Sequence, residues 1–172
     1  MNTLRHPIFG ELPRQNGHTA FADALWTGQV QLAAQAVPVH LRAGDHALDL
    51  PLLDQLAAHR HQLPQLDATA RQHLRAHLDA NRDDIDFHVD EAPRQRPDLD
   101  GSFVQTLAPS GQGAAVATDD FVQALRLNAV SLSCAGLCLD DVIGLGLQGI
   151  ADQILAVRFT AQGAFLHVSE ES

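Results

Sequence analysis

The chain has 172 residues, of which 45% are hydrophobic and 19% charged, so it is long enough and apolar enough for one folded domain. Its net charge is −10 and its eleven basic residues, all arginines, are scattered, which argues against a nucleic-acid partner. No segment approaches the roughly 18 apolar residues of a membrane span and the N-terminus lacks a signal-peptide pattern, so we expect a cytoplasmic protein with no membrane partner. The sequence does not indicate an oligomeric state.

Two segments near the N-terminus alternate between apolar and polar residues, which is typical of antiparallel strands with one buried face. In the first, residues 24–32, Trp26 and Val30 lie on the apolar side. The second, residues 37–42, contains Pro38, which has no N–H to donate to a neighbouring strand. We therefore expect the second strand to lie at a sheet edge or to begin at Pro38.

Residues 50–80 change to the three-and-four spacing of amphipathic helices. Asp49 is the expected N-cap of a first helix, with Pro51 in its first turn, and Asp67 is the expected N-cap of a second. The short connection predicts an antiparallel helical pair. The residues expected to be buried are Leu52, Leu53, Leu56, Leu63, Ala70, Leu74, His77 and Leu78. The following residues 79–101, rich in Asp, Arg and Pro, are expected to form a loop.

The next segments predict a helix that begins at Thr118, a strand over residues 127–134, and a second strand interrupted by glycines. Cys134 and Cys138 are interpreted as small buried residues with free thiols. If both lie on one strand, they are about 13 Å apart, which is too far for a disulfide.

The C-terminal residues 154–168 predict a β-hairpin with Gly163 in the left-handed position of a three-residue loop. The expected cross-strand pairs are Thr160 with Ala164, Phe159 with Phe165, and Val157 with His167. Apolar residues on both sides predict central strands covered on both faces. The whole sequence thus predicts a single α+β domain over residues 1–172, with an antiparallel β-sheet of about five or six strands and an α-helical pair packed on one face.

Motifs for cofactor chemistry are incomplete. Gly144, Gly146 and Gly149 have the spacing of a dinucleotide fingerprint, but a strand is expected after them where the fingerprint needs a helix. The pair His73 and His77 has the spacing of some zinc sites but lacks the Glu of H-E-x-x-H. We therefore expect no cofactor and no bound metal. A stoichiometric metal content would point instead to His59, His61, His73 and His77.

Motifs for catalysis are equally incomplete. Ser131 and Ser133 lie in a predicted strand, and the sequence has no G-x-S-x-G elbow. The pair at residues 119–120 is explained by the start of a helix, and the pair Asp140 and Asp141 by the end of a strand. We therefore expect no catalytic residue.

The most distinctive segment has six acidic residues within residues 79–91, around the aromatic Phe87. Such a surface steers a cationic partner at long range and then loses water around the aromatic ring. The alternative is that these charges only keep the protein soluble. The expected partner-binding residues are Asp83, Asp84, Asp86, Phe87, Asp90 and Glu91.

Three features, HPIFGEL at residues 6–12, the strand with Trp26, and the ending ADQILAVRF followed by a glycine and a closing ES, resemble a family of bacterial proteins with a domain of unknown function. The residues that match the family's ending are Asp152, Leu155, Val157, Phe159, Gly163, Glu171 and Ser172. These motifs are structural and carry over no catalytic residue. Families of this kind are often linked with toxin and immunity genes.

The resemblance and the acidic segment together imply a non-catalytic protein-binding domain, an immunity or antitoxin-like protein that binds a basic partner. The alternative is a small hydrolase or a ligand-sensing module with a His-lined site between helices and sheet. The acidic surface would serve the first function and a buried cavity the second, so the two alternatives predict different sites.

Overall fold

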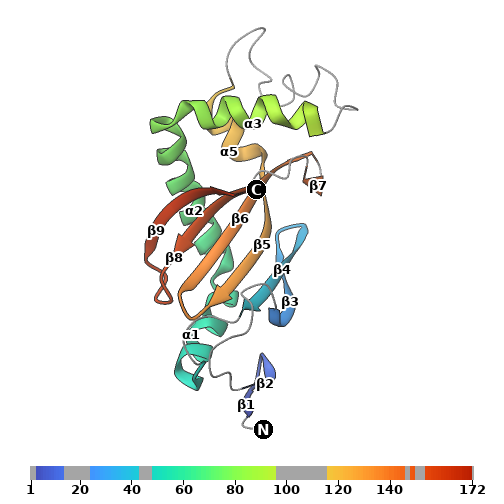
Figure 1. The fold of residues 1–172 in the computed structure, drawn as a ribbon, viewed down its shortest axis with the longest axis vertical. Coiled ribbons are helices and arrows are strands. Elements are labelled where there is room, and N and C mark those ends of the chain that lie inside the picture. Colours follow the sequence, from blue (N-terminus) through green and yellow to red (C-terminus); the bar gives the residue numbers. More distant parts are fainter. Residues whose placement is uncertain are drawn as a thin grey trace.

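A mostly antiparallel sheet forms the centre of the computed structural model, which describes residues 3–13, 24–42, 48–95, 116–145, 148–149 and 154–171 (Figure 1). Its strands follow the order β3 (Ala24–Leu32), β4 (Gln35–Arg42), β5 (Leu125–Ser133), β6 (Gly136–Leu145), β8 (Ile154–Phe159) and β9 (Phe165–Glu171). The short β7 (Gln148–Gly149) pairs with β6. Strands β4 and β5 run parallel, and the other neighbours are antiparallel. Strands β1 (Thr3–His6) and β2 (Gly10–Pro13) form a separate hairpin.

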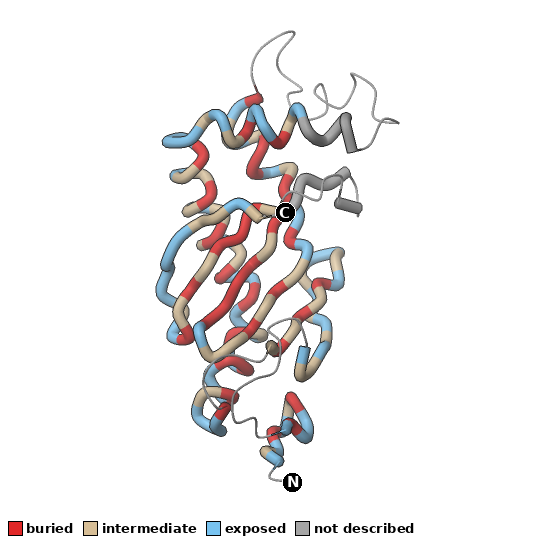
Figure 2. Tube along the Cα trace, in the orientation of Figure 1, coloured by how far each residue is buried: buried red, intermediate tan, exposed pale blue. Residues whose placement is uncertain are grey.

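Helices cover one face of this sheet and extend beyond its ends. Helix α2 (Leu63–Ala80) lies behind the sheet in Figure 1, and α1 (Leu50–His61) continues it past the lower end of the strands. Helices α3 (Arg82–Gln95) and α5 (Thr118–Ala124) lie beyond the upper end. Buried residues concentrate on the central strands and on the helices that face them (Figure 2). The predicted α+β class and the helical pair on one face are therefore confirmed. None of the described helices is long and apolar enough to cross a membrane.

The starts of α1 and α2 show one correct and one wrong prediction. The Asp49 carboxylate accepts a hydrogen bond from the Leu52 backbone N–H at 2.9 Å, as an N-cap does. Asp67 is not an N-cap, because α2 already begins at Leu63. Asp67 lies one turn inside the helix and accepts a hydrogen bond from Arg71 instead.

The residues of the HPIFGEL segment attach the β1–β2 hairpin to the rest of the fold. His6 is buried, and its Nδ1 accepts hydrogen bonds from the backbone N–H groups of Ile8 and Phe9. Its proton is therefore on Nε2, which donates to Asp54 of α1 at 3.1 Å. Phe9 is buried and packs edge-on against Trp26, with 5.1 Å between ring centroids. This segment has a structural role in the described part of the chain.

The C-terminal hairpin follows the predicted turn. Gly163 has φ +84°, and the Thr160 N–H donates to the Ala164 carbonyl at 2.8 Å. Phe159 and Phe165 are opposite each other, as predicted. Val157, however, is opposite Val168, because a register shift between Arg158 and Phe159 displaces the pairing expected with His167. Strand β9 is moreover an edge strand of the described sheet, so the prediction that both C-terminal strands are central is wrong.

Three other local predictions are corrected. Pro38 lies within β4, which begins at Gln35 and is not an edge strand. The parallel pairing of β4 with β5 starts only at Val39, so the N–H that Pro38 lacks is not needed for the hydrogen bonds to β5. The two cysteines do not share a strand, since Cys134 lies between β5 and β6 and Cys138 within β6. Both thiols are free. Gly146 of the glycine motif lies outside the described residues, as do Asp152 and Ser172 of the C-terminal family motif.

Candidate functional site

The acidic segment is helical, which corrects the predicted loop. Helix α3 runs from Arg82 to Gln95, and Asp83 and Asp84 in its first turn are favourable next to the partial positive charge of a helix N-terminus. Ile85 and His88, three positions apart, are both buried and attach the helix to the fold. The sequence pattern did not predict this helix, because the segment has few apolar residues and many charged ones.

Four of the predicted partner-binding residues share the outer side of α3. Asp86 and the adjacent Phe87 each lie three or four positions from Asp83 and from Asp90, and all four are exposed, with Phe87 46% exposed. Figure 2 shows the exposed residues of α3 at the end of the molecule, away from the sheet. We call these four residues the acidic stripe. The side chain of Glu91 lies outside the described residues.

Asp84 has a different environment from the acidic stripe. Its carboxylate accepts a hydrogen bond from Nε2 of His77 on α2 at 3.0 Å, and both side chains are about three-quarters buried. His88 lies nearby with Nε2 at 3.7 Å from Oε1 of Glu170 on β9. Burial lowers the pKa of His88 and raises the pKa of Glu170, so both are shifted toward their neutral forms. Asp84 therefore joins α3 to α2.

The four histidines considered for zinc have separate contacts. His59 donates from Nε2 to the Ala161 carbonyl at 2.7 Å, and His73 stacks on Phe165. His77 binds Asp84, and His61 is exposed. In the described ranges, no group of three or more His, Cys, Asp or Glu side chains is arranged to hold a metal ion. The cavity beside His59, between α1 and the sheet, has a volume of only about 10 Å³, which is the size of a single water site.

The glycine motif and the free thiol have structural surroundings. Gly144 is paired with Gly149 in the β6–β7 ladder, which is not the strand-to-helix turn of a dinucleotide site. Cys138 donates from Sγ to the Asp140 carboxylate at 3.1 Å. Burial and the neighbouring carboxylate raise the pKa of the Cys138 thiol far above its ordinary value. The thiol therefore stays protonated, and the nucleophilic thiolate does not form.

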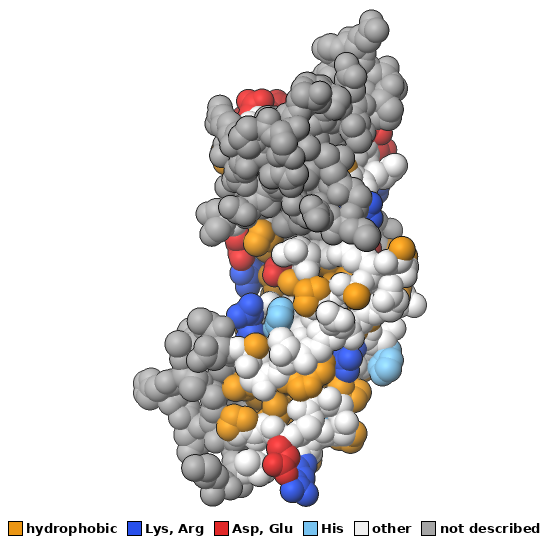
Figure 3. All heavy atoms as spheres, turned by 90° about the vertical axis from the view of Figure 1, so that its right-hand side faces the viewer, with side chains coloured by type: hydrophobic (Ala, Val, Ile, Leu, Met, Phe, Trp, Pro, Cys, Tyr) orange, Lys and Arg blue, Asp and Glu red, His pale blue; other side chains and the backbone are white. Residues whose placement is uncertain are grey.

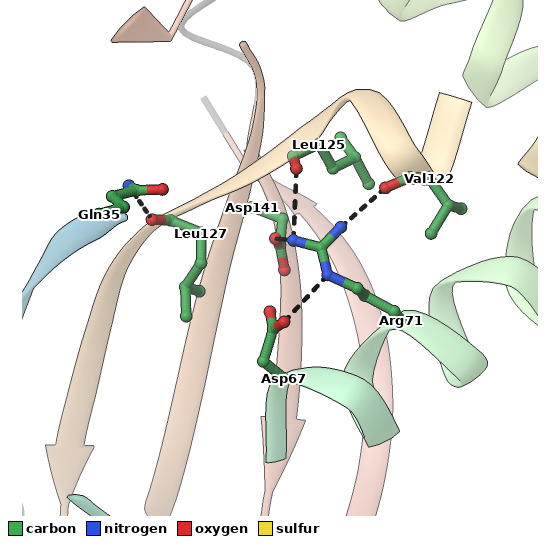
Figure 4. Close-up of polar contacts among 7 residues, drawn as sticks. All are labelled: Gln35, Asp67, Arg71, Val122, Leu125, Leu127 and Asp141. Atoms are coloured by element: carbon green, nitrogen blue, oxygen red, sulfur yellow. Dashed lines mark hydrogen bonds and ion pairs between the residues drawn. The ribbon is translucent and has the colours of Figure 1, made fainter. Parts of the chain in front are cut away.

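A buried polar network surrounds Arg71 of α2 (Figure 4). Its Nε donates to Asp67 at 3.0 Å, and its Nη1 donates to the Val122 carbonyl at 2.8 Å. Its Nη2 donates to the Leu125 carbonyl at 3.3 Å and lies 3.7 Å from Oδ1 of Asp141. One guanidinium thus connects α2 to α5, to the start of β5 and to β6.

Asp141 is the most unusual member of this network. It is fully buried in the middle of β6, not at a strand end as predicted, and neither carboxylate oxygen has a hydrogen-bond partner. Burial raises its pKa to about 7, against the opposing effect of the Arg71 charge. Its neighbour Asp140 faces the other side of the sheet, where it accepts the Cys138 hydrogen bond. The dipeptide therefore places one carboxyl group on each face.

A cavity of about 250 Å³ lies beside this network, between α2, the β3–β4 turn and β5. Arg71 and Asp67 form one wall, and Arg126 of β5 forms another. Gln35 contributes from β4, where its amide nitrogen donates to the Leu127 carbonyl at 2.8 Å. Sequence analysis missed this site, because its polar residues come from four separate segments and form no motif.

Comparisons of the chain with protein-family models, with curated proteins and with solved structures find no match. The resemblance to a bacterial family through HPIFGEL and the C-terminal hairpin therefore remains a prediction.

Proposed function

We propose that this chain is a non-catalytic binding protein that recognises a basic protein through the acidic stripe of α3, as an immunity or antitoxin-like protein would. The observation that supports this proposal is the exposure of Phe87 among Asp83, Asp86 and Asp90 on one side of a helix. An aromatic side chain is an effective anchor once an interface excludes water. Three carboxylates around it favour arginine- and lysine-rich partners and increase the rate of encounter.

The distribution of charge on one other face of the molecule supports the choice of α3. On the face that carries the β3 edge, the visible described residues are mainly uncharged and hydrophobic, with few acidic side chains (Figure 3). Asp84 is occupied by His77. A cationic partner would therefore find the acidic stripe more attractive than the described part of that face.

The test is affinity capture from the native organism followed by measurement of association rates. Asp83→Asn, Asp86→Asn and Asp90→Asn together should leave folding intact and slow association with a captured basic protein by about tenfold or more at low salt. The difference should shrink as the ionic strength passes about 0.15 M. Phe87→Ala should mainly increase the dissociation rate, since the ring contributes after contact.

A matched pair of single substitutions separates local charge from net charge. Asp86→Asn on α3 and Glu11→Gln on β2 each remove one negative charge, and Glu11 lies on the hairpin at the opposite end of the molecule (Figure 1). We expect only Asp86→Asn to slow association. Equal rates for the two variants, or unchanged binding by the triple variant, would place the contact elsewhere.

A further inference from the structure

We propose that the cavity between α2, the β3–β4 turn and β5 binds a small organic monocarboxylate, whose carboxylate group is held by Arg126 while the charge of Arg71 adds to the attraction. This inference is independent of the function proposed for α3. The two sites share no residue, and their ligands have opposite charge.

The charge of the cavity wall differs in sign from that of the chain. The charged side chains that line the cavity are Arg71, Arg126 and Asp67, so two positive charges and one negative charge give +1. The whole chain has a net charge of −10. A ligand with one negative charge neutralises the wall, whereas a doubly charged phosphate would leave a surplus negative charge next to Asp67.

Arg126 is available for a ligand. Its side chain is exposed at the cavity and has no ion pair or hydrogen bond in the described structure. Every other arginine whose side chain is described has a polar partner. The planar guanidinium group matches the two oxygens of a carboxylate, and this geometry is unused at Arg126.

The size and the apolar part of the wall limit the rest of the ligand. A volume of about 250 Å³ is below the usual range for drug-sized ligands. Leu32 adds an apolar surface beside the amide groups of Gln35 and Gln123. These features fit a carboxylate with a short aliphatic or aromatic body.

The β3–β4 turn that forms the rim is held in a strained conformation. Ala33 has φ +51°, and it is the only non-glycine residue with positive φ among the described residues. This region of backbone conformation favours glycine and costs an alanine on the order of 1 kcal/mol. Strain of this kind is concentrated at functional sites, and here it lies in the cavity wall.

The experiment compares three probes that share one six-carbon chain, namely hexanoate, hexanol and hexylammonium, with inorganic phosphate as a fourth. Binding is followed by two-dimensional NMR of the labelled protein, with the backbone amides of Gln35, Gln123 and Leu127 as reporters of the cavity. We expect hexanoate to shift these amides with a dissociation constant in the millimolar range or below, and the other three probes to bind at least about tenfold more weakly.

Two variants locate the charge that matters. Arg126→Gln should weaken hexanoate binding by at least about tenfold. Arg5→Gln, which removes the same charge from the exposed hairpin at the other end of the molecule, should leave it unchanged. Binding of hexanol as tight as that of hexanoate, unchanged affinity in Arg126→Gln, or no shift of the three amides would overturn the proposal. Unchanged hexanoate binding in Asp86→Asn would show that the cavity and α3 act separately.

Discussion

Replacement of Asp141 by Asn is the most direct test of the buried network around Arg71. Asparagine keeps the shape of the side chain but has no titratable proton. In the wild type, burial raises the pKa of Asp141 from 3.8 to about 7, and the Arg71 charge at 3.7 Å opposes this rise only in part. Neither carboxylate oxygen has a hydrogen-bond partner that would favour the charged form. The free energy of unfolding of the wild type should therefore depend on pH in a way that Asp141→Asn removes.

The sign and the size follow from the difference between the folded and unfolded pKa values. The folded state has the higher pKa and so retains the proton to higher pH, and the wild type loses stability as the pH rises from about 4 to about 7. A difference of about three pKa units corresponds to about 4 kcal/mol, of which about 3 kcal/mol is lost between pH 5 and pH 8. Above about pH 8 this contribution is constant.

The assay is urea unfolding of both proteins at pH 5, 6, 7 and 8. The measured quantity is the free energy of unfolding of the wild type minus that of the variant, so the contributions of other titrating groups cancel. We expect Asp141→Asn to gain about 3 kcal/mol relative to wild type across this range, or roughly 10 °C in melting temperature. The NMR signal of the Asp141 carboxyl carbon should titrate near pH 7. A pH-independent difference, together with a titration midpoint near 4, would refute the reasoning.

Three backbone positions give further expected outcomes, all measured by thermal unfolding. Gly163→Ala should cost about 1 kcal/mol, because φ is +84° and the new methyl group would lie 3.2 Å from His59; an unchanged melting temperature would contradict the turn. Gly136→Ala should cost more than Gly163→Ala, since its methyl group would lie 2.0 Å from the Phe159 carbonyl oxygen, and a smaller loss would contradict this packing. Ala33→Gly should instead raise stability by up to about 1 kcal/mol by relieving the positive φ, and a lower melting temperature would show that the turn is unstrained.

The sequence predicted elements whose pattern is local. The N-cap of α1, the helical pair and the Gly163 turn all depend on residues within a few positions of one another, and all three are present. Helix α3 was missed because only Ile85 and His88 of its described side chains are fully buried, and acidic residues outnumber them. His88 is buried and neither of its ring nitrogens has a hydrogen-bond partner, but a search for apolar spacing does not count histidine as an apolar residue.

The cavity could not be predicted, because its residues meet only through the parallel pairing of β4 with β5. Residues 39–41 pair with residues 130–132, 91 positions further along the chain, and this brings the β3–β4 turn next to Arg126. Asp141 was explained as the end of a strand because a charged pair is rare within a strand paired on both sides. Only the position of Arg71 on the facing helix gives that charge a partner.

Arg71 also explains how the short helix α5 ends. The last carbonyl groups of a helix have no partner within the helix. One of them, at Val122, accepts a hydrogen bond from the Arg71 guanidinium, which also donates to the carbonyl of Leu125, the first residue after α5. The guanidinium adds a positive charge where the helix dipole favours one. A lysine has a single nitrogen and could not reach both carbonyls and Asp67 together.

The start of α5 is held by two more arginines from the neighbouring helices. Arg75 of α2 forms an ion pair with Asp119, and Arg82 of α3 donates to the Val116 carbonyl and lies 3.4 Å from the Thr118 hydroxyl. A helix of seven residues is too short to be stable alone, and its N-cap position provides no side-chain hydrogen bond. The arginines of α2 and α3 therefore fix the position of α5. Because α5 carries Gln123 into the cavity wall, they also fix the shape of the cavity.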